Sequence, residues 1–161
     1  MNIAVVFYSL EGHTKYLGEQ LASRLDADLF MVNPRKPYPT QGFYKFFCAG
    51  RDSLFKRNIT LEQPLPVLTS CERIILCTPV WAETTSSPMF SFLKQTDLST
   101  KQLYLVATCS GGPTKRCFLR MRNEVHGAHI LGEATFVEPG EETQQRDEEQ
   151  LCSICEAIRS I

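Results

Sequence analysis

The sequence predicts an α/β protein, with a doubly wound parallel sheet of five strands and helices on both faces. Five short runs rich in β-branched and aromatic residues alternate with segments of helical hydrophobic spacing. A chain of 161 residues suits one domain with a sizeable core, because two independent domains of half that length would be marginally stable. We therefore expect a single domain over residues 1–161.

The first part of the chain contains two strands and one helix. Residues 3–8 form a continuous apolar run, which is typical of a strand buried on both faces. Apolar residues at helical spacing then predict a helix over 14–25. Residues 29–32 form a second strand, which Asn33 and Pro34 end.

A long arm over residues 34–66 follows, with prolines at both ends. Its middle, residues 42–55, could form a helix whose phenylalanines either pack in the core or offer a stacking surface to nucleic acid; core packing is the commoner use of such spacing. Residues 34–58 carry six lysines and arginines against one acid, Asp52. Connections of this length are uncommon unless functional, so we expect a flap beside a site or a surface for a partner.

The remaining strands are predicted over residues 73–77, 102–108 and 130–137. Helices are predicted from Ser87 and Pro88 to Lys94, over 114–125, and over 141–161. Residues 138–149 are acidic, which suits the start of the last helix because anions stabilise a helix N-terminus.

The composition excludes several classes of protein. Seventeen basic and 18 acidic residues give a formal net charge of -1, too small for the bulk field that nucleic-acid or anionic-membrane binders use. No apolar run is long enough to cross a bilayer, and no basic region precedes the first run, so we expect neither a membrane span nor a signal peptide. Seven cysteines, an odd number, favour a reducing cytoplasm over a disulfide framework.

Ligands of such sheets bind beyond the carboxyl ends of the strands, where the strand order reverses. The loop after the first strand has two hydroxyls and a glycine before a helix start, which suits a phosphate; the alternative is an ordinary helix cap. It matches neither the dinucleotide-binding glycine motif nor a Walker A loop. The candidate residues are Ser9, Leu10, Glu11, Gly12, His13 and Thr14.

Two more loops at this edge are candidates. The loop after the third strand carries the only tryptophan, which could cover a planar ligand or simply pack in the core. The loop after the fourth strand has glycines that let backbone amides approach a ligand, or that form a plain turn. The candidates are Thr78, Pro79, Val80 and Trp81 in one, and Thr108, Cys109, Ser110, Gly111 and Gly112 in the other.

The order and spacing of these three loops resemble the flavodoxin-like family of FMN proteins, of the short-chain type, over nearly the whole chain. Residues 5–14 are similar to its phosphate loop, residues 78–81 with Ser87 and Pro88 to its isoalloxazine loop, and residues 107–112 to its third flavin loop. The resemblance implies strand order 2-1-3-4-5 and noncovalent FMN. In that arrangement Ser9, Gly12, His13 and Thr14 would hold the phosphate, and the other two loops would flank the ring.

The sequence departs from this family in three respects. Glu11 stands where many relatives have Ser or Thr, and we expect its side chain to turn outward, because a carboxylate repels a phosphate. The third loop has no aromatic residue, which leaves one ring face open to a second substrate. The nearly neutral charge differs from the acidic balance typical of electron-shuttle members, and Arg35, Lys36, Lys45 or Arg51 near the ring would raise its potential.

Three other pairs of residues give weaker evidence for a metal or catalytic site. Cys152 and Cys155 form a Cys-x-x-Cys pair, but no second pair stands at zinc-site spacing, so core packing in the last helix is favoured. Cys109 and Arg116 are spaced one residue too far apart for a phosphatase loop. His126 and His129 lack carboxylate or cysteine neighbours that would make them metal ligands.

Three functions remain. The first is an electron-transfer flavoprotein whose FMN passes electrons from a reductase to a redox protein partner. The second is an NAD(P)H-dependent flavin or quinone reductase on the same fold. The third is a cofactor-free interaction domain.

Overall fold

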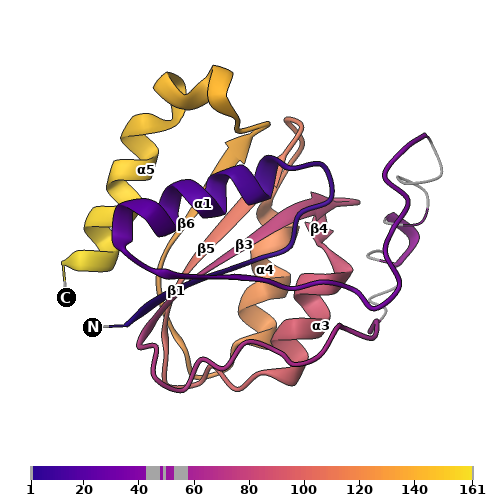
Figure 1. Ribbon diagram of the computed structural model, residues 1–161, viewed down its shortest axis with the longest axis horizontal. Helices are drawn as coiled ribbons and strands as arrows, with labels where there is room; N and C mark the ends of the chain where they lie inside the picture. The colour runs from indigo at the N-terminus through magenta and orange to yellow at the C-terminus, as the bar shows by residue number, and fades with distance from the viewer. Residues whose placement is uncertain (1, 43–47, 49, 53–57, 161) are drawn as a thin grey trace.

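A parallel sheet of five main strands forms the centre of the protein, seen in a computed structural model that describes residues 2–42, 48, 50–52 and 58–160 (Figure 1). The strands are β1 (Ile3–Phe7), β2 (Asp28–Met31), β3 (Arg73–Trp81), β5 (Gln102–Cys109) and β6 (His129–Val137). Their spatial order, β2-β1-β3-β5-β6, confirms the expected order 2-1-3-4-5. All these pairings are parallel.

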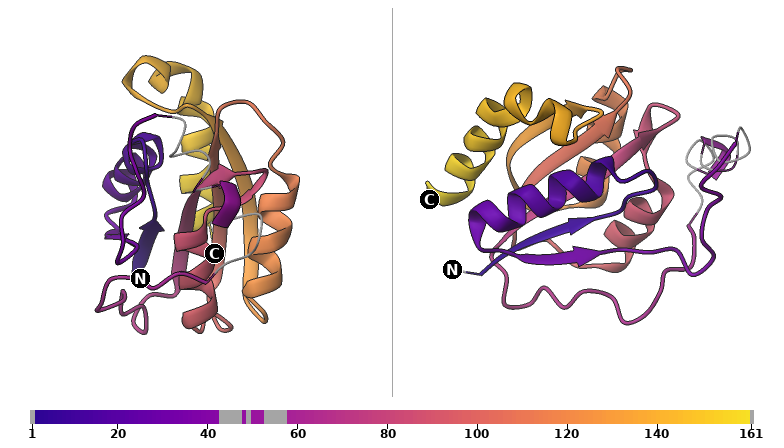
Figure 2. Two further views of the ribbon diagram at one scale, coloured as in Figure 1. Left: turned by 90° about the vertical axis from the view of Figure 1, so that its right-hand side faces the viewer. Right: turned by 45° about the horizontal axis from the view of Figure 1, so that its top comes forward.

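Helices cover both faces of the sheet. On one face lie α1 (His13–Leu25) and α5 (Gln144–Arg159), and on the other α3 (Ser87–Gln95) and α4 (Lys115–Glu124) (Figure 2). Side chains of a strand alternate between faces, so β1 contributes to two separate cores. Its Val6 packs in the core that includes Phe92 of α3, and its Val5 in the core that includes Leu17 of α1.

The third strand is longer than predicted. It continues through the stretch that was expected to be a loop, residues 78–81, and then turns back into a two-residue strand, β4 (Thr84–Thr85). Pro79 is still in register with Thr108 of β5, and Val80 pairs antiparallel with Thr85. Beyond the end of the apolar run, the β3 extension is therefore paired first with β5 and then with β4.

The last helix begins later than predicted. A short 3-10 turn, η1 (Glu141–Thr143), precedes α5, and the hydroxyl of Thr143 accepts a hydrogen bond of 3.0 Å from the backbone N–H of Gly140. The acidic residues expected in the first turns of the helix are thus divided between η1 and α5.

The described ends of the arm are fixed to each other. Pro34 and Leu61 form an isolated antiparallel bridge, and the Arg35 N–H donates to the carbonyl of Thr60 at 2.9 Å. Cys48 and residues 50–52 are helical, but most of the helix predicted over 42–55 lies outside the described residues. Among the described helices, none combines the length and apolar character needed to span a membrane.

Candidate functional site

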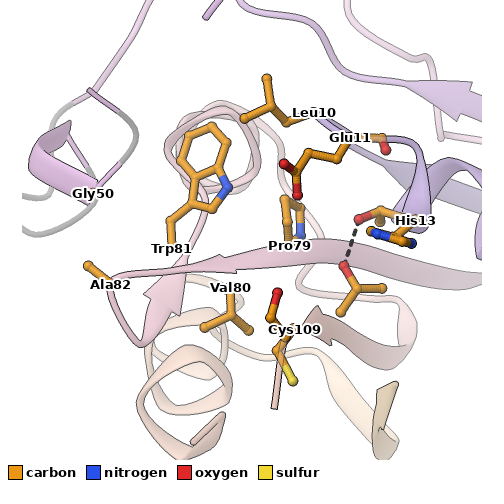
Figure 3. A pocket seen from close by; sticks show the side chains of 13 residues that line it. Leu10, Glu11, His13, Gly50, Pro79, Val80, Trp81, Ala82 and Cys109 are labelled. Atoms are coloured by element: carbon orange, nitrogen blue, oxygen red, sulfur yellow. Dashed lines mark hydrogen bonds between the residues drawn. The ribbon is translucent and has the colours of Figure 1, made fainter. Parts of the chain in front are cut away.

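A cavity of about 290 Å³ opens at the carboxyl ends of β1, β3 and β5 (Figure 3). This is close to the lower end of the range typical of small-molecule sites. The three predicted loops meet in it, together with one residue of the arm. Its lining consists of Ser9, Leu10, Glu11, His13, Thr14, Gly50, Pro79, Val80, Trp81, Ala82, Thr108, Cys109 and Ser110.

The first loop places the N-terminus of α1 at the cavity. Gly12 has a φ of 102°, a left-handed conformation that favours glycine, and its N–H donates to Ser9 Oγ at 3.1 Å. Among the described residues, no side-chain cap closes this end of α1. An uncapped helix N-terminus has backbone N–H groups without intrahelical acceptors and a partial positive charge. The loop therefore offers what an anion needs.

A hydrogen bond beneath the cavity joins the first loop to the third. Thr14 Oγ1 and Thr108 Oγ1 lie 2.7 Å apart, and both residues are buried. Because β3 lies between β1 and β5 in the sheet, this bond bridges the end of the central strand. It fixes the relative position of two loops that both line the cavity (Figure 3).

His13 connects the first loop to the end of β6. Its Nδ1 lies 2.9 Å from the carbonyl oxygen of Pro139, a residue 126 positions away. The backbone before that proline turns through Glu138, which has a φ of 43°, and the Glu138 N–H donates to the carbonyl of Cys109 at 2.9 Å. The end of β6 thus contacts both the first and the third loop, and no motif or spacing in the sequence predicts these contacts.

Trp81 lies at the opposite side of the cavity, packed between two tyrosines. Its ring meets Tyr8 edge-on at a centroid distance of 5.4 Å and Tyr38 of the arm at 4.9 Å. Tyr38 Oη donates to Asp52 Oδ2 at 3.0 Å. Burial raises the pKa of Tyr8, and burial with the bond to Asp52 raises the pKa of Tyr38. Both phenols therefore stay neutral at physiological pH, and the indole is held at the cavity wall.

The β3–β4 hairpin forms another part of the wall. Its two turn residues, Ala82 and Glu83, have φ values of 48° and 63°. Positive φ at both central residues is the mark of a tight hairpin turn that usually carries Asn and Gly. Ala82 lines the cavity, as does Gly50 of the arm, and neither residue was predicted to be part of the site. No turn signature marks residues 82–83, and nothing in the spacing of the arm indicates where it would fold.

Four predicted residues do not line the cavity: Gly12, Thr78, Gly111 and Gly112. Gly12 acts through its backbone, as described above. The Thr78 side chain is fully buried and lies 2.9 Å from Ser86 Oγ, where it ties β3 to the start of α3. Gly111 has a φ of 104°, which favours glycine in the turn after β5.

Glu11 lies differently from the expectation. Its side chain was expected to turn outward, but Glu11 lines the cavity, and Figure 3 shows the side chain extending over the cavity rather than away from it. Among the described lining residues there is no lysine or arginine, so the ionisable groups are the Glu11 carboxylate, the His13 imidazole and the Cys109 thiol. Apart from His13, the cavity offers an anion only backbone N–H groups and neutral hydroxyl donors.

The described basic residues of the arm line another cavity. Arg35, Lys36 and Arg51 line a second cavity of about 690 Å³ together with Tyr38, and none of them lines the first. Arg51 Nε lies 3.0 Å from Asp52 Oδ1. Lys45, the fourth basic candidate, is outside the described residues.

The Cys-x-x-Cys pair of the last helix does not line the cavity. In α5, Cys155 is buried as expected, whereas Cys152 is exposed, so the pair does not pack as a unit. All seven cysteines are free thiols. Within the described residues, no group of three or more His, Cys, Asp or Glu side chains could hold a metal ion.

Comparisons with known proteins agree with this architecture. A family model described as flavodoxin matches residues 2–135. The chain is similar in structure to a flavoprotein from Lactobacillus acidophilus NCFM solved in complex with FMN, at a TM-score of 0.70 and 16% identity, covering 94% of this chain and 98% of that one. It is also similar to oxidised flavodoxin 1 from Bacillus cereus, at a TM-score of 0.57 and 14% identity, covering 98% and 97%. A comparison with curated protein sequences found no significant match.

Proposed function

The chain belongs to the flavodoxin family, and from that premise we propose that it binds FMN noncovalently in the cavity at the carboxyl end of the sheet and carries electrons between a reductase and a redox partner. The observation that carries the proposal is the meeting, in one cavity, of the uncapped N-terminus of α1 and the only tryptophan. The first suits a phosphate and the second a planar ring.

The residues present fit FMN. The backbone N–H groups at the start of α1 and the hydroxyls of Ser9 and Thr14 would hold the phosphate. Residues 79–81 and 108–110 would flank the ring, with Trp81 as the aromatic side. Bound FMN would supply the one- and two-electron chemistry that side chains lack.

The protein's own contribution is to bind, orient and shield. The bond between Thr14 and Thr108 fixes the position of the phosphate loop relative to the third loop. The edge-on contacts of Tyr8 and Tyr38 hold the Trp81 ring at the cavity wall. We propose that the arm covers this side of the cavity, because Gly50 lines it and Tyr38 packs against Trp81. All seven cysteines being free thiols supports a reducing compartment, the cytoplasm.

A second candidate is an NAD(P)H-dependent flavin or quinone reductase. The observation that favours it is the third loop, whose lining residues Thr108, Cys109 and Ser110 include no aromatic ring. That side of a bound flavin would be accessible to a second substrate.

Reconstitution with FMN followed by anaerobic mixing with NADPH tests both candidates. For an electron carrier we expect a yellow holoprotein that NADPH alone does not bleach and that a flavodoxin reductase does reduce. Bleaching by NADPH without a reductase would assign the enzyme instead. A chain that remains colourless after incubation with excess FMN would refute the proposed function.

A further inference from the structure

We propose that FMN binding by this chain is coupled to the uptake of a proton by His13, which makes the imidazolium the counter-charge of the phosphate. The inference rests on the proposed function, since it concerns how the same cavity recognises its ligand. It is carried by the hydrogen bond between His13 and Pro139 and by the charges around the cavity.

The bond to Pro139 determines which ring nitrogen carries the hydrogen. A carbonyl oxygen can only accept, so Nδ1 of His13, 2.9 Å from the Pro139 oxygen, must be the donor. In a neutral imidazole the other nitrogen then has no hydrogen and is itself an acceptor. In neutral His13, a lining residue of the cavity, Nε2 therefore carries a lone pair and no hydrogen.

The oxygens of a dianionic phosphate are only acceptors, so this form of the ligand gains nothing from a neutral His13. If Nε2 is protonated as well, His13 becomes a cation that still donates to Pro139 and has a second N–H for the phosphate. Such a charge-assisted bond is about twice as strong as one between neutral groups. Arrival of the phosphate thus favours protonation, and protonation favours the phosphate.

The other charges around the cavity leave this role to His13. Glu11 lines the same cavity, and Glu138 precedes Pro139 in the chain, so the acidic residues named here cannot serve as the counter-charge of a phosphate. Of the cations on the neighbouring helices, Lys15 of α1 lies 3.8 Å from Glu19, and Arg146 of α5 lies 2.7 Å from Asp147. Cys109, the remaining titratable lining residue, is neutral as a thiol.

Histidine is the side chain whose charge generally changes between pH 5 and 8, so the test covers that range. We expect the FMN dissociation constant of the apoprotein to increase about tenfold from pH 6 to pH 8.5 through this contribution. The phosphate of FMN also titrates near pH 6 and acts in the opposite direction. The relevant quantity is therefore the difference in pH dependence between the wild type and a His13 variant.

The experiment titrates apoprotein with FMN from pH 6 to 8.5 by flavin fluorescence, with calorimetry in two buffers of different ionisation enthalpy to count the protons taken up. His13→Gln keeps a hydrogen-bond donor without titrating, and we expect it to lose the proton uptake near pH 7. His126→Gln, at an exposed histidine outside the cavity, is the matched control and should retain it. Riboflavin, which has no phosphate, should bind without proton uptake.

Equal pH dependence and equal proton uptake in the wild type and His13→Gln would overturn the inference while leaving the proposed function intact. His13→Arg provides a second variant in case His13→Gln folds poorly. Its permanent charge should give FMN affinity that no longer weakens at pH 8.5. Failure of the wild type to bind FMN at any pH would refute the proposed function, and the inference with it.

Discussion

The hydroxyl oxygens of Thr14 and Thr108 lie 2.7 Å apart beneath the cavity, although 94 residues separate them along the chain. Thr14 is 2% exposed and Thr108 4%, so each hydroxyl depends mainly on the other for its hydrogen bond. A buried hydroxyl without a partner costs about 1–3 kcal/mol, whereas removing both partners costs less. The free energy of unfolding therefore depends on Thr14 and Thr108 as a pair rather than on each residue separately.

We expect Thr108→Val to lower the free energy of unfolding by about 1–3 kcal/mol, because it leaves the Thr14 hydroxyl unsatisfied. The double variant Thr14→Val with Thr108→Val should be destabilised by less than the sum of the single variants. Urea denaturation of all four proteins measures the coupling. Strict additivity would mean that the bond has no energetic role.

Glu11→Gln should tighten FMN binding by about three- to tenfold, because it removes a carboxylate that lines the cavity close to the proposed phosphate site. The gain should shrink at high salt, since Glu11 is exposed. Glu72→Gln makes the same change of charge on an exposed residue at the other end of β3 and should leave the affinity unaltered. An equal gain from both variants would point to net charge rather than to the position of Glu11.

The β3–β4 turn predicts opposite effects for two substitutions at one site. Ala82 has a φ of 48°, a conformation that costs roughly 1–2 kcal/mol for most residues and less for Asn. Ala82→Asn should therefore raise the free energy of unfolding by about 0.5 kcal/mol, and Ala82→Val should lower it by about 1 kcal/mol or more. Thermal unfolding compares them. Equal stability of the two variants would show that the turn stores no strain.

Alkaline pH should destabilise the protein through its buried thiols and phenols. Burial raises the pKa of Cys117 to about 12 and that of Cys77 further, and the pKa values of Tyr8 and Tyr38 are also raised. When the pKa of a group is higher in the folded state, the native protein keeps the proton at a pH at which the unfolded chain has already lost it. The free energy of unfolding is then highest below about pH 8.5, the ordinary cysteine value, and falls as pH rises.

Urea denaturation between pH 7 and 10 under reducing conditions measures this slope. Cys117→Ala should make the decline shallower by up to about 1.4 kcal/mol per pH unit, the limit for one proton. A free energy of unfolding that increases from pH 7 to 10 would contradict the predicted direction of the pH dependence.

The fold could be predicted largely because apolar runs report burial directly. Residues 4–8 and 73–77 are buried on both faces, and that requirement alone places them in the middle of a parallel sheet. The β4 hairpin was missed because its turn, Ala82 and Glu83, adopts positive φ without the Asn or Gly that would reveal it. Here tertiary pairing with β3 outweighs local preference.

The position of the site followed from the topology, and its details did not. Parallel strands bring the three loops to one edge, so their meeting could be anticipated. The approach of Gly50 depends on how the arm packs through Tyr38 onto Trp81, which no periodicity encodes. The bond from His13 to Pro139 joins residues 126 positions apart, and Glu11 takes an orientation that a pairwise charge argument did not anticipate.

The central claim is that FMN occupies the cavity beside Trp81, and the fluorescence of that residue tests it most directly. Trp81 is the only tryptophan in the chain, so the indole emission reports on the cavity alone. Titration with FMN should quench this emission, with saturation at one equivalent per chain and well beyond the inner-filter loss seen with free tryptophan amide. Emission that follows only the inner-filter loss, while FMN is retained on the protein, would place the cofactor elsewhere and contradict the account.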